Sequence, residues 1–224
     1  MRKITLHIIL LFLFGFVIHN AAHGQIIKGT VIAGASLTQV EGDEIKGWSQ
    51  FGFNGGVGAI VPFGKNKNWG ANLETVFSQK GAFQKKQFDT DSLTAEYRLR
   101  LNYFEVPVYI TYTDKDVLTF GLGGYWARLV SASEKEHSGN REPYIDSVAF
   151  NDNDWGFLVD FKVRIWKHLH LNVRYSQSLG IIRERYFPAL YSQEAFIRKQ
   201  KNQVLSLRFV YIFNEGKRGR GQEQ

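Results

Sequence analysis

The sequence predicts an all-β protein, an eight-stranded antiparallel transmembrane up-and-down β-barrel. Three observations lead to this fold class. Apolar and polar residues alternate over many segments, the connections between these segments are alternately short and long, and the chain opens with an export-type apolar run. The alternation is clearest in residues 155–165 and 169–176, on either side of a tight turn at Lys167 and His168. A period of two indicates strands with one apolar and one polar face. In a closed sheet the apolar face can meet lipid while the polar face fills the interior.

The amino terminus has the three parts of a secretory signal peptide. Arg2 and Lys3 precede an apolar run over residues 4–18, and Ala22-His23-Gly24 is the expected cleavage site. We therefore predict a signal peptide at residues 1–24. The alternative, a retained anchor helix, needs about 20 apolar residues. The chain has no cysteine, which excludes a lipoprotein anchor and disulfide bonds.

The charge of the chain bears on its partners. The formal charge of +7 falls to +5 when Arg2 and Lys3 are removed with the signal peptide. Export and the spread of the basic residues among the strands argue against nucleic acid and favour anionic lipid headgroups as the counterpart.

The first three candidate strands follow the signal peptide. Residues 27–38, 51–61 and 71–78 each alternate apolar residues with polar residues or glycine, and residues 62–68 form a short turn between the second and third. In a narrow lumen, inward glycines leave room for large side chains from across the barrel. The second strand carries three such glycines, Gly52, Gly56 and Gly58.

The fourth candidate strand, residues 97–112, follows a long polar connection at residues 81–96. Its apolar face changes phase at Phe104. A one-residue bulge at Tyr103–Glu105 would restore the sorting of the two faces, and Pro107, which cannot donate to the ladder, fits beside such a defect.

The remaining strands complete the count of eight. Residues 118–126 follow a turn at 113–116, and a long connection at 131–153 leads to the sixth and seventh strands described above. An irregular segment at 183–201 precedes the last strand, residues 205–213.

The connection lengths predict the orientation of the barrel. Outer-membrane barrels have short periplasmic turns and long outer loops, and an even strand count then places both mature termini in the periplasm. We therefore predict an outer-membrane barrel at residues 25–213 and a flexible basic periplasmic tail at 214–224. Aromatic residues lie near both predicted rims, as membrane interfaces require: Trp69, Tyr112 and Trp166 at the short-turn rim, and Trp48, Trp126 and Trp155 at the long-loop rim.

Four short stretches and the closing strand resemble the PorT-like outer-membrane β-barrel family, which carries the outer membrane protein beta-barrel domain. The stretches are Glu74–Gly81 (ETVFSQKG), Leu101–Val108 (LNYFEVPV), Gly121–Ala127 (GLGGYWA) and Asn153–Gly156 (NDWG), and the closing strand ends at Phe213. The resemblance implies a small porin-like barrel of the Gram-negative outer membrane and a link with protein secretion. It implies no catalytic residues.

The polar faces of the strands supply the main candidate site, a lumen charge network. In a lumen just wide enough for side chains, charges of both signs pair into a plug. The alternative is a narrow channel, which would favour anions because basic residues outnumber acids. The predicted members are Glu74, Arg98, Arg100, Glu105, Asp160, Lys162, Arg164, Arg174 and Arg208.

The last irregular segment supplies a second candidate site, where cations stand among aromatic residues. Such a set can hold lipopolysaccharide phosphates or a partner protein at the outer rim. The alternative is a loop that folds over the barrel mouth. The predicted contacts are Arg183, Arg185, Tyr186, Phe187, Arg198 and Lys199.

No catalytic or metal-binding residues are predicted, and no cofactor. The mature chain keeps His137, His168 and His170, which assemble no triad with a nucleophile, and Asp152 and Asp154 lack the spacing of a calcium loop. The chain is thus expected to be no enzyme.

We predict a structural, binding or secretion-accessory protein that acts through its long outer loops. Its expected partners are outer-membrane lipid and lipopolysaccharide, the barrel assembly machinery, and a secretion or surface protein. A soluble periplasmic lipocalin-like ligand binder is the alternative, since alternation alone does not say which face points inward.

Overall fold

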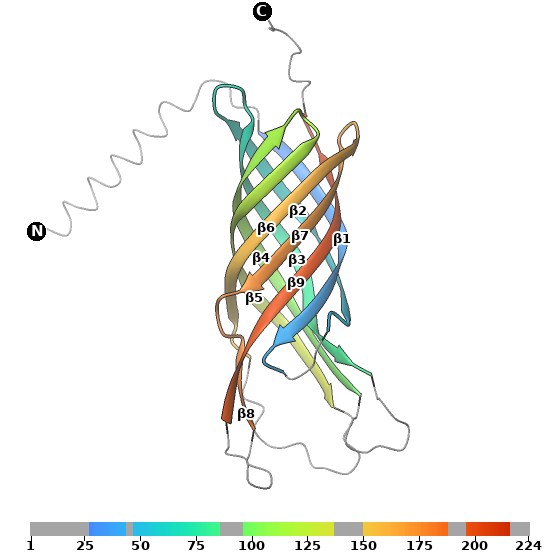
Figure 1. The fold of residues 1–224 in the computed structure, drawn as a ribbon, viewed down its shortest axis with the longest axis vertical. Coiled ribbons are helices and arrows are strands. Elements are labelled where there is room, and N and C mark those ends of the chain that lie inside the picture. Colours follow the sequence, from blue (N-terminus) through green and yellow to red (C-terminus); the bar gives the residue numbers. More distant parts are fainter. Residues whose placement is uncertain (1–26, 44–46, 86–95, 137–149, 188–195, 216–224) are drawn as a thin grey trace, which may run out of the picture.

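Eight strands close into a barrel in the computed structural model, which describes residues 27–43, 47–85, 96–136, 150–187 and 196–215 (Figure 1). Each strand pairs antiparallel with the next in the order β1-β2-β3-β4-β5-β6-β7-β9, and β9 pairs back with β1. The short β8 pairs with β9 alone and extends the wall beyond the ring. The up-and-down barrel is therefore confirmed. The strands are β1 Lys28–Glu41, β2 Gln50–Phe63, β3 Trp69–Gln84, β4 Tyr97–Asp114, β5 Leu118–Glu136, β6 Asn153–Trp166, β7 Leu169–Ser178, β8 Arg183–Phe187 and β9 Phe196–Ile212.

The two ends of the barrel differ in their connections. The short-turn end, uppermost in Figure 1, holds the β2–β3, β4–β5 and β6–β7 turns, and the long-loop end holds the other five connections, including those on either side of β8. In the β4–β5 turn, Lys115 and Asp116 have φ angles of 45° and 58°, and the amide of Val117 donates to the carbonyl of Asp114 at 3.0 Å. Two successive left-handed residues give the turn the twist that a hairpin needs.

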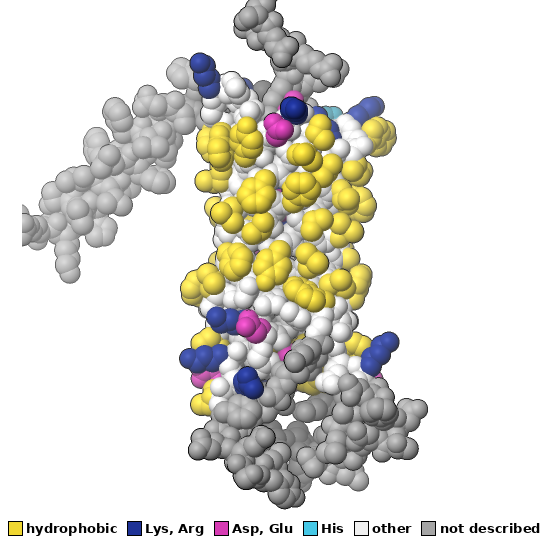
Figure 2. Space-filling model, in the orientation of Figure 1, with side chains coloured by type: hydrophobic (Ala, Val, Ile, Leu, Met, Phe, Trp, Pro, Cys, Tyr) yellow, Lys and Arg dark blue, Asp and Glu magenta, His cyan; other side chains and the backbone are white. Residues whose placement is uncertain are grey.

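A belt of apolar side chains covers the outside of the barrel (Figure 2). On β5, for example, Leu118, Phe120, Leu122 and Trp126 all point outward, and Leu122 is 57% exposed. A surface of this kind is stable against lipid, not against water. The apolar faces therefore point outward, and the lipocalin-like alternative, which needs them inside, is wrong. Within the described residues no helix is long and apolar enough to cross a membrane.

Aromatic side chains border the belt at both ends. Near the short-turn end, the rings of Trp69 and Tyr112 pack edge to face with centroids 5.1 Å apart, and Trp166 is exposed. Near the long-loop end, Trp126 and Trp155 are exposed and stand directly opposite each other on β5 and β6. These positions suit membrane interfaces, where amphipathic rings are favourable.

The phase change predicted in β4 is absent. Odd-numbered residues from Tyr97 to Thr111 face the interior, while Arg98 and Arg100 are exposed on the outside. The irregularity lies at the same level on the neighbouring strand, because Asn102 pairs with Ser131 and Tyr103 with Leu129, leaving one extra residue in β5. The bulge expected in β4 is therefore wrong.

The same face of β4 points outward along the whole strand, but its surroundings change at Phe104. The positions that carry apolar residues therefore change from the outward to the inward face. Beyond Phe104 the strand leaves the apolar belt, so its outward side chains meet water. The inward side chains of this part of β4 belong to an apolar core, which extends as far as Tyr109 at the level of the belt. Its members are Val40, Ala82, Tyr97, Leu99, Leu101, Tyr103, Tyr109, Tyr125, Ala127, Leu158 and Ile182.

Candidate functional site

A buried cluster of charges fills the middle of the barrel, and we name it the central cluster: Glu74, Asp160, Lys162, Arg174 and Arg208. These residues come from β3, β6, β7 and β9, and each stands on the inward face that the period of two assigns to it. Their side chains are at most 6% exposed. The structure thus brings together five of the nine residues predicted for the lumen network.

Two arginines bridge the two carboxylates of the central cluster. Arg174 donates through Nε to Asp160 Oδ2 at 2.8 Å, and through Nη1 and Nη2 to Glu74 at 2.8 and 3.2 Å. Arg208 donates through Nη2 to Asp160 Oδ2 at 3.0 Å and through Nη1 to Glu74 Oε2 at 3.3 Å. Such charge-assisted, forked contacts hold both carboxylates in fixed positions.

Neutral groups complete the central cluster. The hydroxyl of Tyr109 donates to Glu74 Oε1, and Arg208 Nε donates to Asn172 Oδ1 at 2.6 Å. Gly58 lies beside Glu74: a Cβ built there would stand 2.9 Å from Glu74 Cγ. The role expected for this inward glycine, making room for a large side chain, agrees with that distance.

A second buried cluster, which the sequence analysis missed, lies nearer the long-loop end. Lys80 Nζ stands 2.6 Å from Glu105 Oε1 and 3.2 Å from Asp154 Oδ2, between the rings of Tyr103 and Tyr125. Asp154 Oδ2 also accepts hydrogen bonds from three further groups. The donors are Tyr125 Oη, Ser178 Oγ and Asn202 Nδ2. We name Lys80, Glu105 and Asp154 the upper cluster; in the orientation of Figure 1 it lies in the lower part of the barrel, toward the long-loop end.

The two clusters balance each other in charge. The central cluster carries three cations and two carboxylates, and the upper cluster one cation and two carboxylates. Ion pairs of this kind fill a narrow lumen with side chains. The arrangement is suited to holding eight strands together.

The other predicted network residues lie elsewhere. Arg98 and Arg100 are on the outside of β4, so their assignment to the lumen is wrong, for the reason given by the inverted pattern beyond Phe104. Arg164 lies at the short-turn end, where its Nη2 donates to Glu215 Oε1 at 2.6 Å. Glu105 belongs to the upper cluster.

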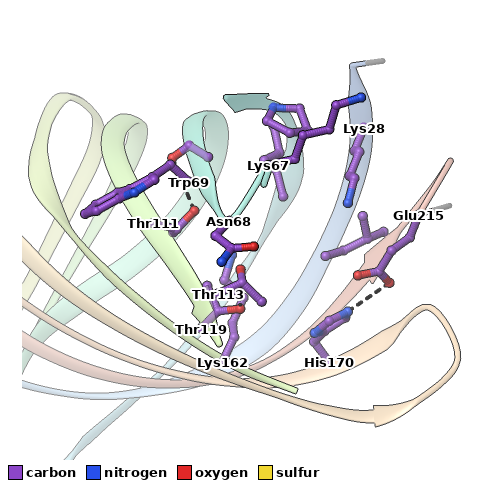
Figure 3. Close-up of a pocket in the computed structure, with 14 residues that line it drawn as sticks. Lys28, Lys67, Asn68, Trp69, Thr111, Thr113, Thr119, Lys162, His170 and Glu215 are labelled. Atoms are coloured by element: carbon purple, nitrogen blue, oxygen red, sulfur yellow. Dashed lines mark hydrogen bonds and ion pairs between the residues drawn. The ribbon is translucent and has the colours of Figure 1, made fainter. Parts of the chain in front are cut away.

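Glu215, which follows β9, reaches into the short-turn mouth of the barrel (Figure 3). His170 Nε2 lies 3.1 Å from its Oε2, and a recess of about 40 Å³ beside this pair has room for a few water molecules. Burial alone would raise the pKa of the Glu215 carboxyl, but the hydrogen bond and charge of His170 and the charge of Arg164 outweigh it. The pKa therefore lies below its ordinary value of 4.5.

The Glu215→Gln variant tests this contact through the pH dependence of stability. A carboxyl whose pKa is lowered by folding stabilises the folded state above its unfolded pKa, and this contribution is lost as the pH falls through the folded-state pKa. At pH 7 the variant is expected to be less stable by about 1 kcal/mol, since contacts to a charged group are weakened by nearby water.

The measurement is the temperature at which the folded band is lost on detergent gels, recorded between pH 7 and pH 2. The difference between wild type and Glu215→Gln should shrink with acid and then vanish. The control, Asp114→Asn in the β4–β5 turn, should show no such convergence. A difference that is constant with pH would contradict the assigned role of Glu215.

The predicted outer-loop contacts are only partly exposed. Arg183 is 4% exposed in its side chain: Nη1 and Nη2 donate to Glu134 at 2.7 and 3.1 Å, Nε donates to Gln200, and the guanidinium lies 4.3 Å from the ring of Phe150. Its expected role as an exposed lipid or partner contact is therefore wrong. Arg183 instead ties β8 and β9 to β5.

The other members of this set divide in two. Arg198 and Lys199 are exposed on β9. The backbone of β8 includes Arg185, Tyr186 and Phe187, but their side chains lie outside the described part of the structure.

The titratable residues considered for catalysis or metal binding have structural neighbours. His168 and His170 both face Glu215, Asp154 belongs to the upper cluster, and Asp152 pairs with Arg128 at 3.0 Å. His137 lies outside the described residues. In the parts of the chain that the structure describes, no group of three or more histidine, cysteine, aspartate or glutamate side chains is arranged to hold a metal ion.

A closed ring of antiparallel strands with an apolar outside and a paired, polar inside defines an integral membrane β-barrel. The family model described as outer membrane protein beta-barrel domain matches residues 27–183, which is 157 of the 224 residues. The chain belongs to this family, and its place is the outer membrane. This match indicates no enzymatic family, and the PorT-like subfamily stays a prediction. No curated protein sequence matches the chain.

Three solved structures of bacterial barrels are similar to this chain. Ail, the attachment invasion locus protein of Yersinia pestis, is 10% identical, with 84% of this chain and 99% of that chain covered and a TM-score of 0.44. OprG from Pseudomonas aeruginosa is 13% identical, with 86% and 98% covered and a TM-score of 0.44. Neisserial surface protein A is 11% identical, with 84% and 99% covered and a TM-score of 0.39. The barrel assignment depends on the strand order, not on these likenesses.

Proposed function

We propose that this protein is a filled, non-conducting barrel of the outer membrane that serves as a structural or binding platform through its long-loop end. In this proposal residues 1–24 are a signal peptide that is removed on export, and the barrel assembly machinery inserts the mature chain. The short turns and both mature termini lie in the periplasm, and the long loops face outward, as in other barrels of this kind.

The pairing of charges inside the barrel is the observation that supports this proposal. A conducting pore needs a continuous polar path, whereas here the paired charges of the central and upper clusters and the side chains of the apolar core pack against one another inside the barrel. Arg174 and Arg208 each contact both carboxylates of the central cluster, so opening a path there would separate several buried ion pairs.

Conductance across planar lipid bilayers tests the proposal. The mature protein, purified from outer membranes and verified by a gel band that shifts on heating, should give no discrete current steps in 1 M KCl. A general porin inserted under the same conditions is the control. Stable steps would overturn the filled barrel, and a preference for anions would support the narrow-channel alternative, which the excess cation of the central cluster favours.

Epitope insertion tests the orientation separately. An epitope placed in the β3–β4 connection should be labelled on intact cells, and the same epitope in the β2–β3 turn only after permeabilisation. The reverse pattern would overturn the orientation without affecting the filled barrel.

The resemblance to PorT-like barrels carries the proposal one step further, to a secretion-accessory role. Deletion of the protein should then lower the amount of secreted or surface-displayed protein while the outer membrane stays intact. Unchanged secretion would leave a structural or binding role as the function.

A further inference from the structure

Four basic side chains lie on the outside of the barrel at the long-loop end, Arg128 at the edge of the apolar belt and the other three beyond it. Arg98 and Arg100 on β4 and Arg128 and Lys135 on β5 are all exposed. Cross-strand pairs share a face, and the register places Arg98 opposite Lys135 and Phe104 opposite Arg128. We name these four residues the β4–β5 basic face.

The β4–β5 basic face brings like charges close together. Residues directly opposite on antiparallel strands have Cβ atoms roughly 5 Å apart, and like charges there are destabilising. Among the described residues, the acids at this face are Glu96, 3.3 Å from Arg98, and Asp152, 3.0 Å from Arg128. Two positive charges remain in excess, so a bound anion would remove a repulsion that the fold otherwise retains.

The geometry of the face suits a phosphate. The guanidinium of Arg98 lies over the ring of Phe83, 4.8 Å from its centroid, and its Nη2 donates to Glu96 at 3.3 Å. A phosphate would therefore be met by the other N–H groups of this guanidinium. Arg100 stands two residues further along the same outward face. Two guanidinium groups can donate forked hydrogen bonds to phosphate oxygens, and an ammonium adds a third positive charge. A carboxylate has fewer oxygens to accept these bonds, and a neutral ligand has no charge to match them.

The height of the face identifies the class of ligand. Phe104 is the last outward apolar residue of β4 before Asn102, Arg100 and Arg98. At about 2.6 Å of barrel height per tilted residue, Arg100 stands about 10 Å beyond Phe104, at the outer side of a headgroup layer that is itself roughly 5–8 Å thick. Figure 2 shows basic side chains just beyond the apolar belt on the long-loop side. A ligand there can place acyl chains against the belt and its phosphates against the cations.

We propose that the β4–β5 basic face binds the phosphate groups of lipopolysaccharide in the outer leaflet. This inference rests on the proposed orientation, because the long-loop end meets lipopolysaccharide only if it faces outward. It names the lipid that the barrel selects and places the contact on β4 and β5, away from the contacts predicted on β8 and β9.

The test is binding of bisphosphorylated lipid A to the purified full-length mature protein in detergent. Lipid A that binds the folded state raises the temperature at which the folded gel band is lost, by an amount that gives an apparent Kd. For the triple variant Arg98→Ser, Arg100→Ser, Lys135→Ser, we expect an apparent Kd at least tenfold weaker than wild type. Raising the salt concentration should weaken wild-type binding and leave the variant unchanged.

Matched variants separate the charges of this face from charge in general. The triple variant Lys65→Ser, Lys115→Ser, Lys167→Ser removes the same charge at the short-turn end and should bind lipid A as wild type does. Arg98→Lys with Arg100→Lys keeps the charge and loses the forked geometry, so a loss of a few fold is expected. This variant also serves if the serine triple does not fold.

Three results would overturn the inference. In the first, wild type and both β4–β5 variants bind lipid A equally. In the second, wild type binds lipid A stripped of its phosphates as tightly as bisphosphorylated lipid A. In the third, binding is lost only in the double variant Arg198→Ser with Lys199→Ser. The last result would move the lipid contact to β9 and leave the proposed function in place. The conductance and labelling experiments test the proposed function independently of all three.

Discussion

Replacing Asp160 with asparagine is expected to destabilise the folded barrel by about 3–5 kcal/mol, because it leaves buried cations without their counter-charge. Asp160 Oδ2 receives hydrogen bonds from Arg174 at 2.8 Å and from Arg208 at 3.0 Å, and Lys162 Nζ stands 3.8 Å from Asp160 Oδ1. Asparagine keeps the shape of the side chain and removes only its charge. Three cations would then share the single carboxylate of Glu74.

The experiment compares urea-induced unfolding of wild type and Asp160→Asn in lipid vesicles. Asp152→Asn is the matched control, since Asp152 is also paired with an arginine but is 64% exposed, and its loss should cost no more than about 1 kcal/mol. The double variant Asp160→Asn with Lys162→Met should recover part of the stability, because it removes one of the uncompensated cations. Equal destabilisation by Asp160→Asn and Asp152→Asn would contradict the plug.

The interior was predictable from the sequence where the strand pattern is regular. Glu74, Asp160 and Arg174 stand at even positions of alternating stretches, and the period of two assigns each of them to the inward face of its strand. Their partners were not predictable, because pairing between β3, β6 and β7 depends on how the closed sheet is staggered.

The upper cluster was missed although its signal is present in the sequence. Lys80 continues the even series of Glu74 and Ser78, and Asp154 continues that of Gly156 and Asp160. Both residues stand at strand ends, next to stretches that read as loops. The strands in fact extend well beyond the lipid, so the alternation should be followed past the last apolar outward residue.

The two wrong assignments have one cause. Arg98 and Arg100 were placed inside because the rule of apolar outside and polar inside was applied along the whole of β4. Arg183 is predicted to be a lipid or partner contact because it stands with other cations among aromatic residues in a segment without regular alternation. Outside the belt the protein follows the ordinary rule of soluble proteins, with apolar residues and fully paired charges inside.

The position of the edge of the apolar belt can be tested by making the same substitution at two exposed positions, one inside the belt and one outside it. Leu122 on β5 is 57% exposed and lies midway between Leu118 and Trp126, whereas Ile197 on β9 is 61% exposed. Lys199, Lys201 and Gln203 separate Ile197 from the apolar residues of the same strand face. The two side chains are similarly exposed, but the structure places Leu122 in lipid and Ile197 in water.

Leu122→Arg is therefore expected to destabilise the barrel by about 2–4 kcal/mol, the cost of a charged side chain on the lipid face near the bilayer midplane. Ile197→Arg should change stability by no more than about 0.5 kcal/mol, as for an ordinary surface position. Both are measured by urea-induced unfolding in vesicles. Equal costs at the two sites would mean that the boundary drawn at Phe104 and Trp126 is misplaced. The inverted pattern of β4 would then need another cause, and the β4–β5 basic face would no longer stand at the level of the headgroups.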